Sequence, residues 1–212
     1  MSYFKAYLFD LDGTLVDTAA GYEQLLFELE WIKSPLDNTA KYLSGVDVRA
    51  LIDYLFYGVQ IDIAERTQFF LDYYSANLHR SILFYPGALD TLETLKKHKL
   101  VVGIVSNRNN IYCQQIQKIY DLNLDIFMGS GIIPYRKPHP APLLYAANKL
   151  NLKTTECFYL GDMPTDLHAS HLALMHAAYC RYGCFHFFDP HFHYRQEIDS
   201  LEDITKTFLH RS

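Results

Sequence analysis

Cysteine and long apolar runs are both scarce in this 212-residue chain. Four cysteines are too few for the disulfide framework of a small secreted domain, so we expect a reducing compartment. The apolar stretch near the N-terminus is interrupted by Asp10 and Asp12, and no later stretch is long enough to span a bilayer. These features predict a cytoplasmic protein without a membrane partner.

Basic charge is also in short supply. The chain has 19 lysine and arginine residues against 24 aspartate and glutamate residues, a formal net charge of −5 with the ten histidines neutral. Nucleic-acid binding generally needs a net basic face to neutralise phosphates, so we expect no nucleic-acid partner. Glycine and proline are near average and half of the residues are apolar, which excludes disordered, collagen-like and coiled-coil chains.

The sequence does contain an alternation of short apolar runs with helical patterns. Between the runs, apolar residues recur at spacings of three and four, as along the buried stripe of a helix. Runs that are apolar throughout are typical of strands covered by helices on both faces. The expected strands are Ala6–Phe9, Val101–Val105, Ile126–Met128, Phe158–Leu160 and Ala177–Cys180. This pattern predicts an α/β fold with a doubly wound parallel sheet, a Rossmann-like core.

One interval of the chain contains no strand pattern. Residues 17–83 show helical stripes only, and so long a loss of strand signal is hard to reconcile with one continuous sheet. We therefore predict two domains: a core formed by residues 1–16 and 84–212, and an inserted all-helical cap formed by residues 17–83. Asp17 is expected to cap the first helix of the insert or to act as its hinge.

Polar residues of a particular kind accompany the expected strands. The segments are Asp10-Leu11-Asp12-Gly13-Thr14, Ser106-Asn107-Arg108, Tyr135-Arg136-Lys137-Pro138 and Gly161-Asp162-Met163-Pro164-Thr165-Asp166. In an open parallel sheet, ligands bind at the carboxyl ends of the strands, near the point where the strand order reverses. Carboxylates, a hydroxyl, an amide and an ammonium group would meet there. Such a set suits a divalent cation together with a phosphate.

Taken in order, these segments resemble the four motifs of the haloacid-dehalogenase superfamily in its phosphatase form. Phe9–Asp17 resembles the first motif, Val105-Ser106-Asn107 the second, Arg136–Pro140 the third, and Gly161-Asp162 with Asp166 the fourth. Four motifs at compatible positions are far more specific than one. The resemblance covers nearly the whole chain. The helical insert lies where phosphoglycolate phosphatases and beta-phosphoglucomutases of this superfamily carry a cap domain.

The resemblance implies a role for each matching residue. Asp10 is the nucleophile that becomes phosphorylated, and Asp12 protonates the leaving oxygen and then removes a proton from the attacking water. A phosphate monoester repels nucleophiles, so attack by a carboxylate needs a cation beside it. The implied ligands of a Mg²⁺ cofactor are Asp10, the backbone carbonyl of Asp12, Asp162 and, assisting nearby, Asp166. The implied phosphate-binding residues are Thr14, Ser106, Asn107 and Lys137.

These implications predict a Mg²⁺-dependent phosphatase, similar to phosphoglycolate phosphatase, that hydrolyses a small phosphorylated metabolite through an aspartyl-phosphate intermediate. A phosphomutase of the beta-phosphoglucomutase type would use the same two aspartates, Asp10 and Asp12. A non-catalytic binding protein on this scaffold is the alternative from another class. A dehalogenase is disfavoured because that branch lacks the second carboxylate. We expect a monomer or a homodimer.

The C-terminal part contains a second set of metal-binding residue types. The residues that suggest a zinc hypothesis are Cys180, Cys184, His186, His191 and His193. Their spacing meets the paired pattern of structural zinc sites only loosely. We therefore favour a surface loop or a dimer contact for this stretch.

Overall fold

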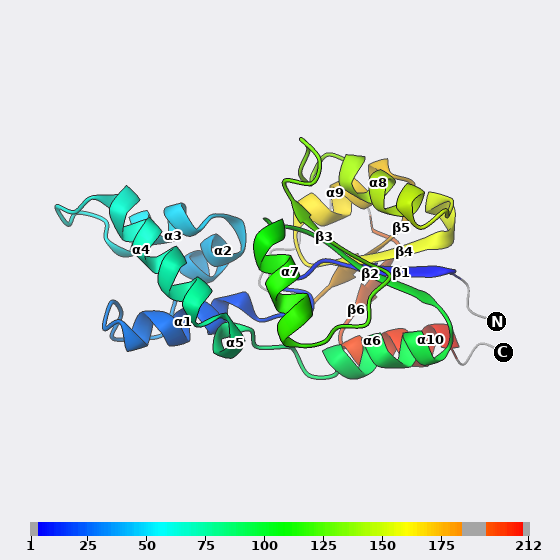
Figure 1. Ribbon diagram of the computed structural model, residues 1–212, viewed down its shortest axis with the longest axis horizontal. Coiled ribbons are helices and arrows are strands. Elements are labelled where there is room, and N and C mark those ends of the chain that lie inside the picture. The colour runs from blue at the N-terminus through cyan, green and yellow to red at the C-terminus, as the bar shows by residue number, and fades with distance from the viewer. Residues whose placement is uncertain (1–3, 184–193, 210–212) are drawn as a thin grey trace. The chain divides into compact units, whose positions relative to one another are not determined.

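The structure of the chain, a computed structural model, describes residues 4–183 and 194–209 (Figure 1). In these residues, six parallel strands form one sheet in the order β3-β2-β1-β4-β5-β6. The strands are β1 (Ala6–Phe9), β2 (Val101–Asn109), β3 (Ile126–Ser130), β4 (Cys157–Gly161), β5 (His176–Cys180) and β6 (Gln196–Ile198). The strand order reverses between β1 and β4, which confirms the predicted doubly wound sheet.

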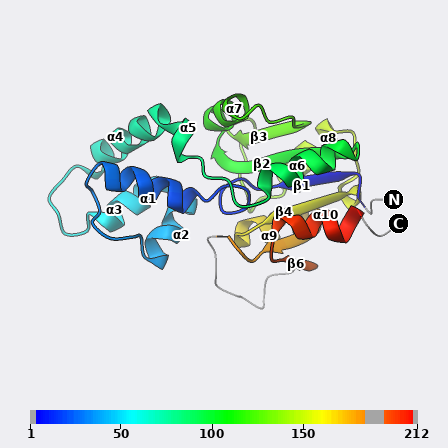
Figure 2. The same ribbon diagram turned by 90° about the horizontal axis from the view of Figure 1, so that it is seen from below.

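Helices cover both faces of this sheet. They are α6 (Ala88–Lys97), α7 (Asn110–Ile119), α8 (Ala141–Lys149), α9 (Pro164–Leu172) and α10 (Leu201–Leu209), with a short 3₁₀ turn η1 (Thr154–Glu156). Figure 1 shows α8 and α9 above the sheet and α6 and α10 below it, and Figure 2 shows α6 and α10 side by side. Within the described residues, no helix combines the length and the apolarity that a bilayer crossing requires.

The core beneath α8 and α9 holds the central strands in place. Its fully or almost fully buried members are Ala6, Leu8, Val105, Leu143, Ala146, Ala147, Cys157, Tyr159, Ala169, Ala173 and Met175. Small alanines on both helices allow close approach to the sheet. Tyr159 brings a phenolic hydroxyl into this layer, and a buried hydroxyl requires a hydrogen-bond partner.

The register of the central strands brings their carboxyl ends to the same level. Phe9, the last residue of β1, pairs with Ile104 of β2 and with Leu160 of β4. Asp10 follows directly, and its backbone N–H donates to the carbonyl of Leu160 at 2.8 Å. Residues that follow β1 and β4 therefore leave the sheet side by side at the carboxyl ends of the strands.

The chain divides into two compact units, residues 1–16 with 84–212 and residues 17–83. The second unit is helical throughout its regular structure. Its helices are α1 (Thr18–Glu28), α2 (Asn38–Val46), α3 (Val48–Leu55), α4 (Ile63–Ala76) and α5 (Leu78–Ser81). Asp17 is the N-cap of α1, as predicted, because its side chain accepts a hydrogen bond from the backbone N–H of Ala20 at 2.9 Å.

Aromatic side chains and one close backbone approach hold the helical unit together. Tyr22 of α1 meets Phe70 and Tyr74 of α4 edge to face, with ring centroids 5.3 and 5.0 Å apart. At Gly21 the backbone of α1 lies so near the end of α5 that a Cβ atom would overlap the carbonyl oxygen of Ser81. Glycine at this position therefore sets how closely α1 and α5 pack.

We predict that Gly21→Ala destabilises the protein, because an added methyl group forces α1 and α5 apart. Overpacking of this kind costs about 1–3 kcal/mol. Gly45 is the matched control, since it also lies inside a helix, α2, but its added Cβ would meet nothing within 4 Å. Gly45→Ala should instead stabilise by about 0.5–1 kcal/mol through helix propensity. Urea unfolding measures both, and equal effects of the two variants would contradict the close approach.

Candidate active site

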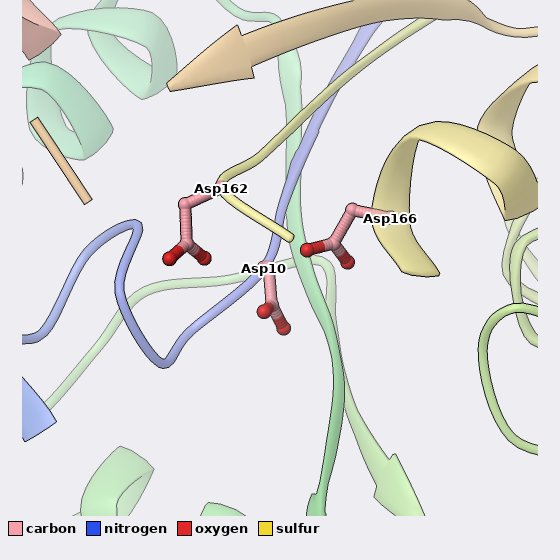
Figure 3. Close-up of side chains that lie close together, drawn as sticks. All are labelled: Asp10, Asp162 and Asp166. Carbon is pink, nitrogen blue, oxygen red and sulfur yellow. The ribbon is translucent and has the colours of Figure 1, made fainter. Parts of the chain in front are cut away.

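Three aspartates gather at the carboxyl ends of β1 and β4 (Figure 3). Asp10 follows β1, Asp162 follows β4, and Asp166 lies in the first turn of α9. One carboxylate oxygen of each lies within 4.8 Å of the others, and the three residues are 6%, 1% and 0% exposed. The structure thus brings together three residues from two segments that lie about 150 positions apart in the sequence.

Lys137 supplies positive charge to this cluster from the loop between β3 and α8. Its Nζ donates to Oδ1 of Asp10 at 2.7 Å and to Oδ1 of Asp166 at 2.6 Å, and the residue is 4% exposed. Asn107 fixes the Lys137 backbone from β2. The Asn107 Oδ1 atom accepts from the Lys137 N–H at 2.9 Å, and Nδ2 donates to the Lys137 carbonyl at 2.8 Å.

The cluster carries more negative than positive charge. Burial and the neighbouring Asp166 carboxylate raise the pKa of Asp10 from its ordinary 3.8 to about 7, against the opposing effect of Lys137. Burial alone would lower the pKa of Lys137, but Asp10 and Asp166 outweigh it and raise that pKa to about 12. Three carboxylates with one ammonium group beside two of them form a set of hard oxygen donors with an unbalanced charge. This set fits a divalent cation such as Mg²⁺.

Glycine backbone packs closely around the Asp162 side chain. A Cβ at Gly13, whose φ is +76°, would overlap the Asp162 carboxylate, and a Cβ at Gly183 would overlap the Asp162 Cβ. The Thr14 hydroxyl donates to Oδ1 of Asp162 at 3.4 Å. The turn after β1 therefore holds the Asp162 carboxylate in place, and Thr14, predicted to bind phosphate, contacts that carboxylate in this structure.

The remaining predicted residues lie at the end of β2 and on the turn after β1. Ser106 Oγ accepts a hydrogen bond from the backbone N–H of Arg108 at 3.1 Å. The Asp12 carboxylate points to the Arg108 side chain, whose Nε lies 3.1 Å from both of its oxygens. The Asp12 carboxylate is therefore ion-paired with Arg108, so a metal contact by Asp12 would use the backbone carbonyl, as the resemblance implies.

Two side chains at this site were given no role in the sequence analysis, although Arg108 belongs to the polar segment expected there. Arg108 directly follows the second motif. A charged residue at the end of a buried strand is the sequence feature that could have indicated a role for it. Tyr159 Oη contacts the Lys137 Nζ at 2.8 Å, the Asp166 Oδ1 at 3.1 Å and the Val105 carbonyl at 3.0 Å. Its hydroxyl lies within an apolar run, where the pattern indicates core packing and gives no sign of a polar contact.

The zinc hypothesis concerns mostly residues outside the described ranges. Cys184, His186, His191 and His193 all lie there. Cys180 is described at the end of β5, where it is buried and its Sγ lies 3.6 Å from the carbonyl oxygen of Gly13. The zinc hypothesis therefore stays untested.

A doubly wound sheet whose switch point holds buried carboxylates and a lysine is the arrangement expected of an α/β enzyme that binds a cation and an anionic substrate. The model of a family described as haloacid dehalogenase-like hydrolase matches residues 7–179. The chain belongs to this family, as the sequence motifs predicted, and the expected enzyme class, a phosphatase of this family, is confirmed by its relatives.

These relatives match over most of their length. A phosphoglycolate phosphatase from Mannheimia succiniciproducens is 32% identical over 203 residues, which covers 86% of this chain and 88% of the relative. The solved structure of a predicted phosphoglycolate phosphatase from Haemophilus somnus 129pt has a TM-score of 0.80 at 25% identity and covers 98% and 99% of the two chains. A HAD-superfamily hydrolase of subfamily IA from Geobacter sulfurreducens PCA shares the fold, with a TM-score of 0.74, 17% identity and coverage of 98% and 97%.

The raised pKa of Asp10 predicts how metal-free protein responds to pH. Between about pH 4 and pH 7 the folded state binds more protons at Asp10 than the unfolded state, so the free energy of unfolding should fall as the pH rises. A rise of about three pKa units at 1.36 kcal/mol each sets an upper bound of about 4 kcal/mol. Urea unfolding in EDTA at several pH values between 5 and 8 measures this slope.

Asp10→Asn is the control for this measurement because it cannot titrate. Burial lowers the pKa of His176, which gives a slope of opposite sign in both proteins. The difference between wild type and Asp10→Asn isolates the contribution of Asp10. Identical pH slopes in the two proteins would show that the pKa of Asp10 is not raised.

Proposed function

We propose that the protein is a Mg²⁺-dependent phosphatase that hydrolyses small phosphate monoesters of the phosphoglycolate type through an aspartyl-phosphate on Asp10. The buried cluster of Asp10, Asp162 and Asp166 around Lys137, at the switch point of the sheet, is the observation that carries the proposal. The relatives named phosphoglycolate phosphatase support the substrate class.

The proposed Mg²⁺ site consists of Asp10, Asp162 and the backbone carbonyl of Asp12, with Asp166 beside them. When bound, the cation supplies positive charge that offsets the carboxylates and the incoming phosphate. Lys137 already binds Asp10 and Asp166, so it would offset the repulsion between these carboxylates while the site is assembled. The Thr14 contact to Asp162 would orient the third carboxylate.

Asp10 is the proposed nucleophile. The Lys137 ammonium group holds Oδ1, which directs Oδ2 toward the phosphorus atom. A bond forms between Oδ2 and phosphorus while the ester P–O bond breaks, and Asp12, protonated from solvent beforehand, gives that proton to the leaving oxygen. Asp12 then takes a proton from a water molecule whose oxygen attacks phosphorus. This second step releases inorganic phosphate and restores the Asp10 carboxylate.

Residues at the end of β2 are proposed to bind the phosphate. The Ser106 hydroxyl accepts one hydrogen bond from the Arg108 backbone, and its own hydrogen is the donor offered to a phosphate oxygen. One N–H of the Asn107 amide goes to the Lys137 carbonyl, which leaves the second N–H of that group for phosphate. Lys137 would add positive charge on the same side.

The helical unit, residues 17–83, is the proposed cap. A phosphorylated aspartate hydrolyses readily in water, so a segment that excludes bulk water and admits substrate is part of the mechanism. Specificity for the leaving group would then come in part from this unit. We propose a small phosphorylated metabolite as substrate and a monomer or homodimer as the assembly.

Removal of metal should abolish phosphate release, and Mg²⁺ should restore it. Asp162→Asn keeps the shape of the side chain and removes its charge. The Mg²⁺ concentration that gives half-maximal activity should then rise by about 10-fold or more. Malachite-green detection of phosphate from phosphoglycolate, after EDTA treatment and Mg²⁺ titration, measures this change.

Asp53→Asn is the matched control, because Asp53 is an exposed carboxylate on α3. It should leave the Mg²⁺ dependence unchanged. A Mg²⁺-induced rise in melting temperature, present in wild type and reduced in Asp162→Asn, reports the same binding without turnover. Full activity of the wild-type protein in EDTA would rule out the metal-dependent mechanism.

The two aspartates of the first motif should respond differently to the same substitution. Asp10→Asn removes the nucleophile and should abolish turnover. Asp12→Asn keeps the backbone carbonyl and loses proton transfer, a loss of about 10²–10⁴-fold. With p-nitrophenyl phosphate, whose leaving group needs little protonation, Asp12→Asn should release a burst of nitrophenol followed by slow turnover, because the second step still lacks its base.

The position of the trapped phosphoryl group decides this assignment. Mass spectrometry of Asp12→Asn quenched during the burst should locate the phosphoryl group on Asp10. A phosphoryl group on another residue, or near wild-type turnover by Asp10→Asn, contradicts the mechanism. Conversion of a sugar 1-phosphate to its 6-phosphate without release of inorganic phosphate would favour a mutase.

A further inference from the structure

Arg108 forms a second, separate charge pair beside the aspartate cluster. Its Nε lies 3.1 Å from both carboxylate oxygens of Asp12, and its Nη2 also donates to Oδ1. The Arg108 side chain is 6% exposed and that of Asp12 is 14% exposed. Both charges are therefore largely removed from water, where a guanidinium group needs an anionic partner.

This pair involves the carboxylate that the proposed mechanism assigns to proton transfer. To contact a leaving oxygen, Asp12 must turn at least one of its oxygens away from Arg108. The buried guanidinium group then loses part of its partner, and breaking a buried pair without replacement is strongly unfavourable. The neighbouring carboxylates of Asp10 and Asp166 do not replace Asp12 as the partner of Arg108, because Lys137 binds both of them.

A negatively charged group on the substrate would remove this difficulty. Asp12 has to lie within about 2.6–3.2 Å of the leaving oxygen to transfer a proton. The Arg108 guanidinium group, which pairs with Asp12, therefore lies about one hydrogen-bond length further from the leaving oxygen than Asp12 does. A carboxylate attached one carbon from the ester oxygen spans that distance and matches the fork of the guanidinium group.

We propose that Arg108 is a specificity-determining residue that exchanges its partner from Asp12 to a carboxylate on the leaving group. Substrates of this class are phosphate esters of 2-hydroxy carboxylic acids. Their carboxylate binds Arg108 and releases Asp12, which takes up a proton from solvent and then transfers it to the leaving oxygen, whereas a neutral leaving group leaves Asp12 held as a carboxylate. The inference rests on the proposed phosphatase reaction and adds the reason for its choice of substrate.

The test compares two substrates of nearly the same shape, phosphoglycolate and phosphoglycolamide, whose neutral amide replaces the carboxylate. Wild type should prefer phosphoglycolate in kcat/KM by about 100-fold. In Arg108→Gln, kcat/KM for phosphoglycolate should fall by about 100-fold, while that for the amide should stay level or rise because Asp12 is released. Arg108→Lys should keep part of the preference, since it retains the charge without the fork.

Arg181→Gln is the matched control, because Arg181 is an exposed arginine of the same unit, paired with Glu197. It should leave both kcat/KM values unchanged.

Equal losses for both substrates in Arg108→Gln and in Arg108→Lys would overturn the proposal, because Arg108 would then only orient Asp12. Wild type that hydrolyses both substrates equally well would overturn it too and leave the phosphatase reaction intact. Wild type with Mg²⁺ that releases phosphate from neither would overturn the proposed function itself.

Discussion

Three buried carboxylates gather where β1 and β4 end, and two of them, Asp10 and Asp166, share the buried ammonium group of Lys137. Charges removed from water are unfavourable unless they are paired, so the surrounding structure has to hold them in an exact arrangement. The parallel register places Asp10 beside the end of β4, and Asn107 fixes the backbone that carries Lys137. Tyr159 adds a hydroxyl between Lys137 and Asp166. Strand register, loop and core packing are thus all constrained by one cluster of charge.

The fold and the aspartate cluster could be predicted because both depend on regular backbone geometry. Apolar runs indicate strands, and parallel strands bring the residues that follow them to the same end of the sheet. Asp10 and Asp162 were therefore expected to lie close together. β6 was missed because three residues at a sheet edge are too few to form a pattern. β2 extends through Arg108 to Asn109 because its ladder to β3 resumes after an irregularity, which the sequence pattern does not show.

The side-chain contacts could not be predicted, since spacing gives the position of a residue and not the partner of its atoms. Asn107 lies where the second motif placed it, yet its amide binds the backbone of Lys137. Thr14 likewise contacts Asp162. These polar groups support the charged ones, a role that no single motif indicates. The pairing of Asp12 with Arg108 joins residues 96 positions apart and depends on the rotamers of both.

Asp10 and Asp12 are separated by one residue and nevertheless form ion pairs with different partners, Lys137 and Arg108. The turn at Gly13, with backbone N–H groups of Leu15 and Val16 directed at the Leu11 carbonyl, points the two carboxylates in different directions. Asp10 enters a cluster with excess negative charge, which favours a bound cation. Asp12 enters a balanced pair, which favours exchange of one anion for another. In the proposed mechanism, one short turn thereby gives metal binding and nucleophilic attack to the first carboxylate, and leaves the second to respond to the leaving group.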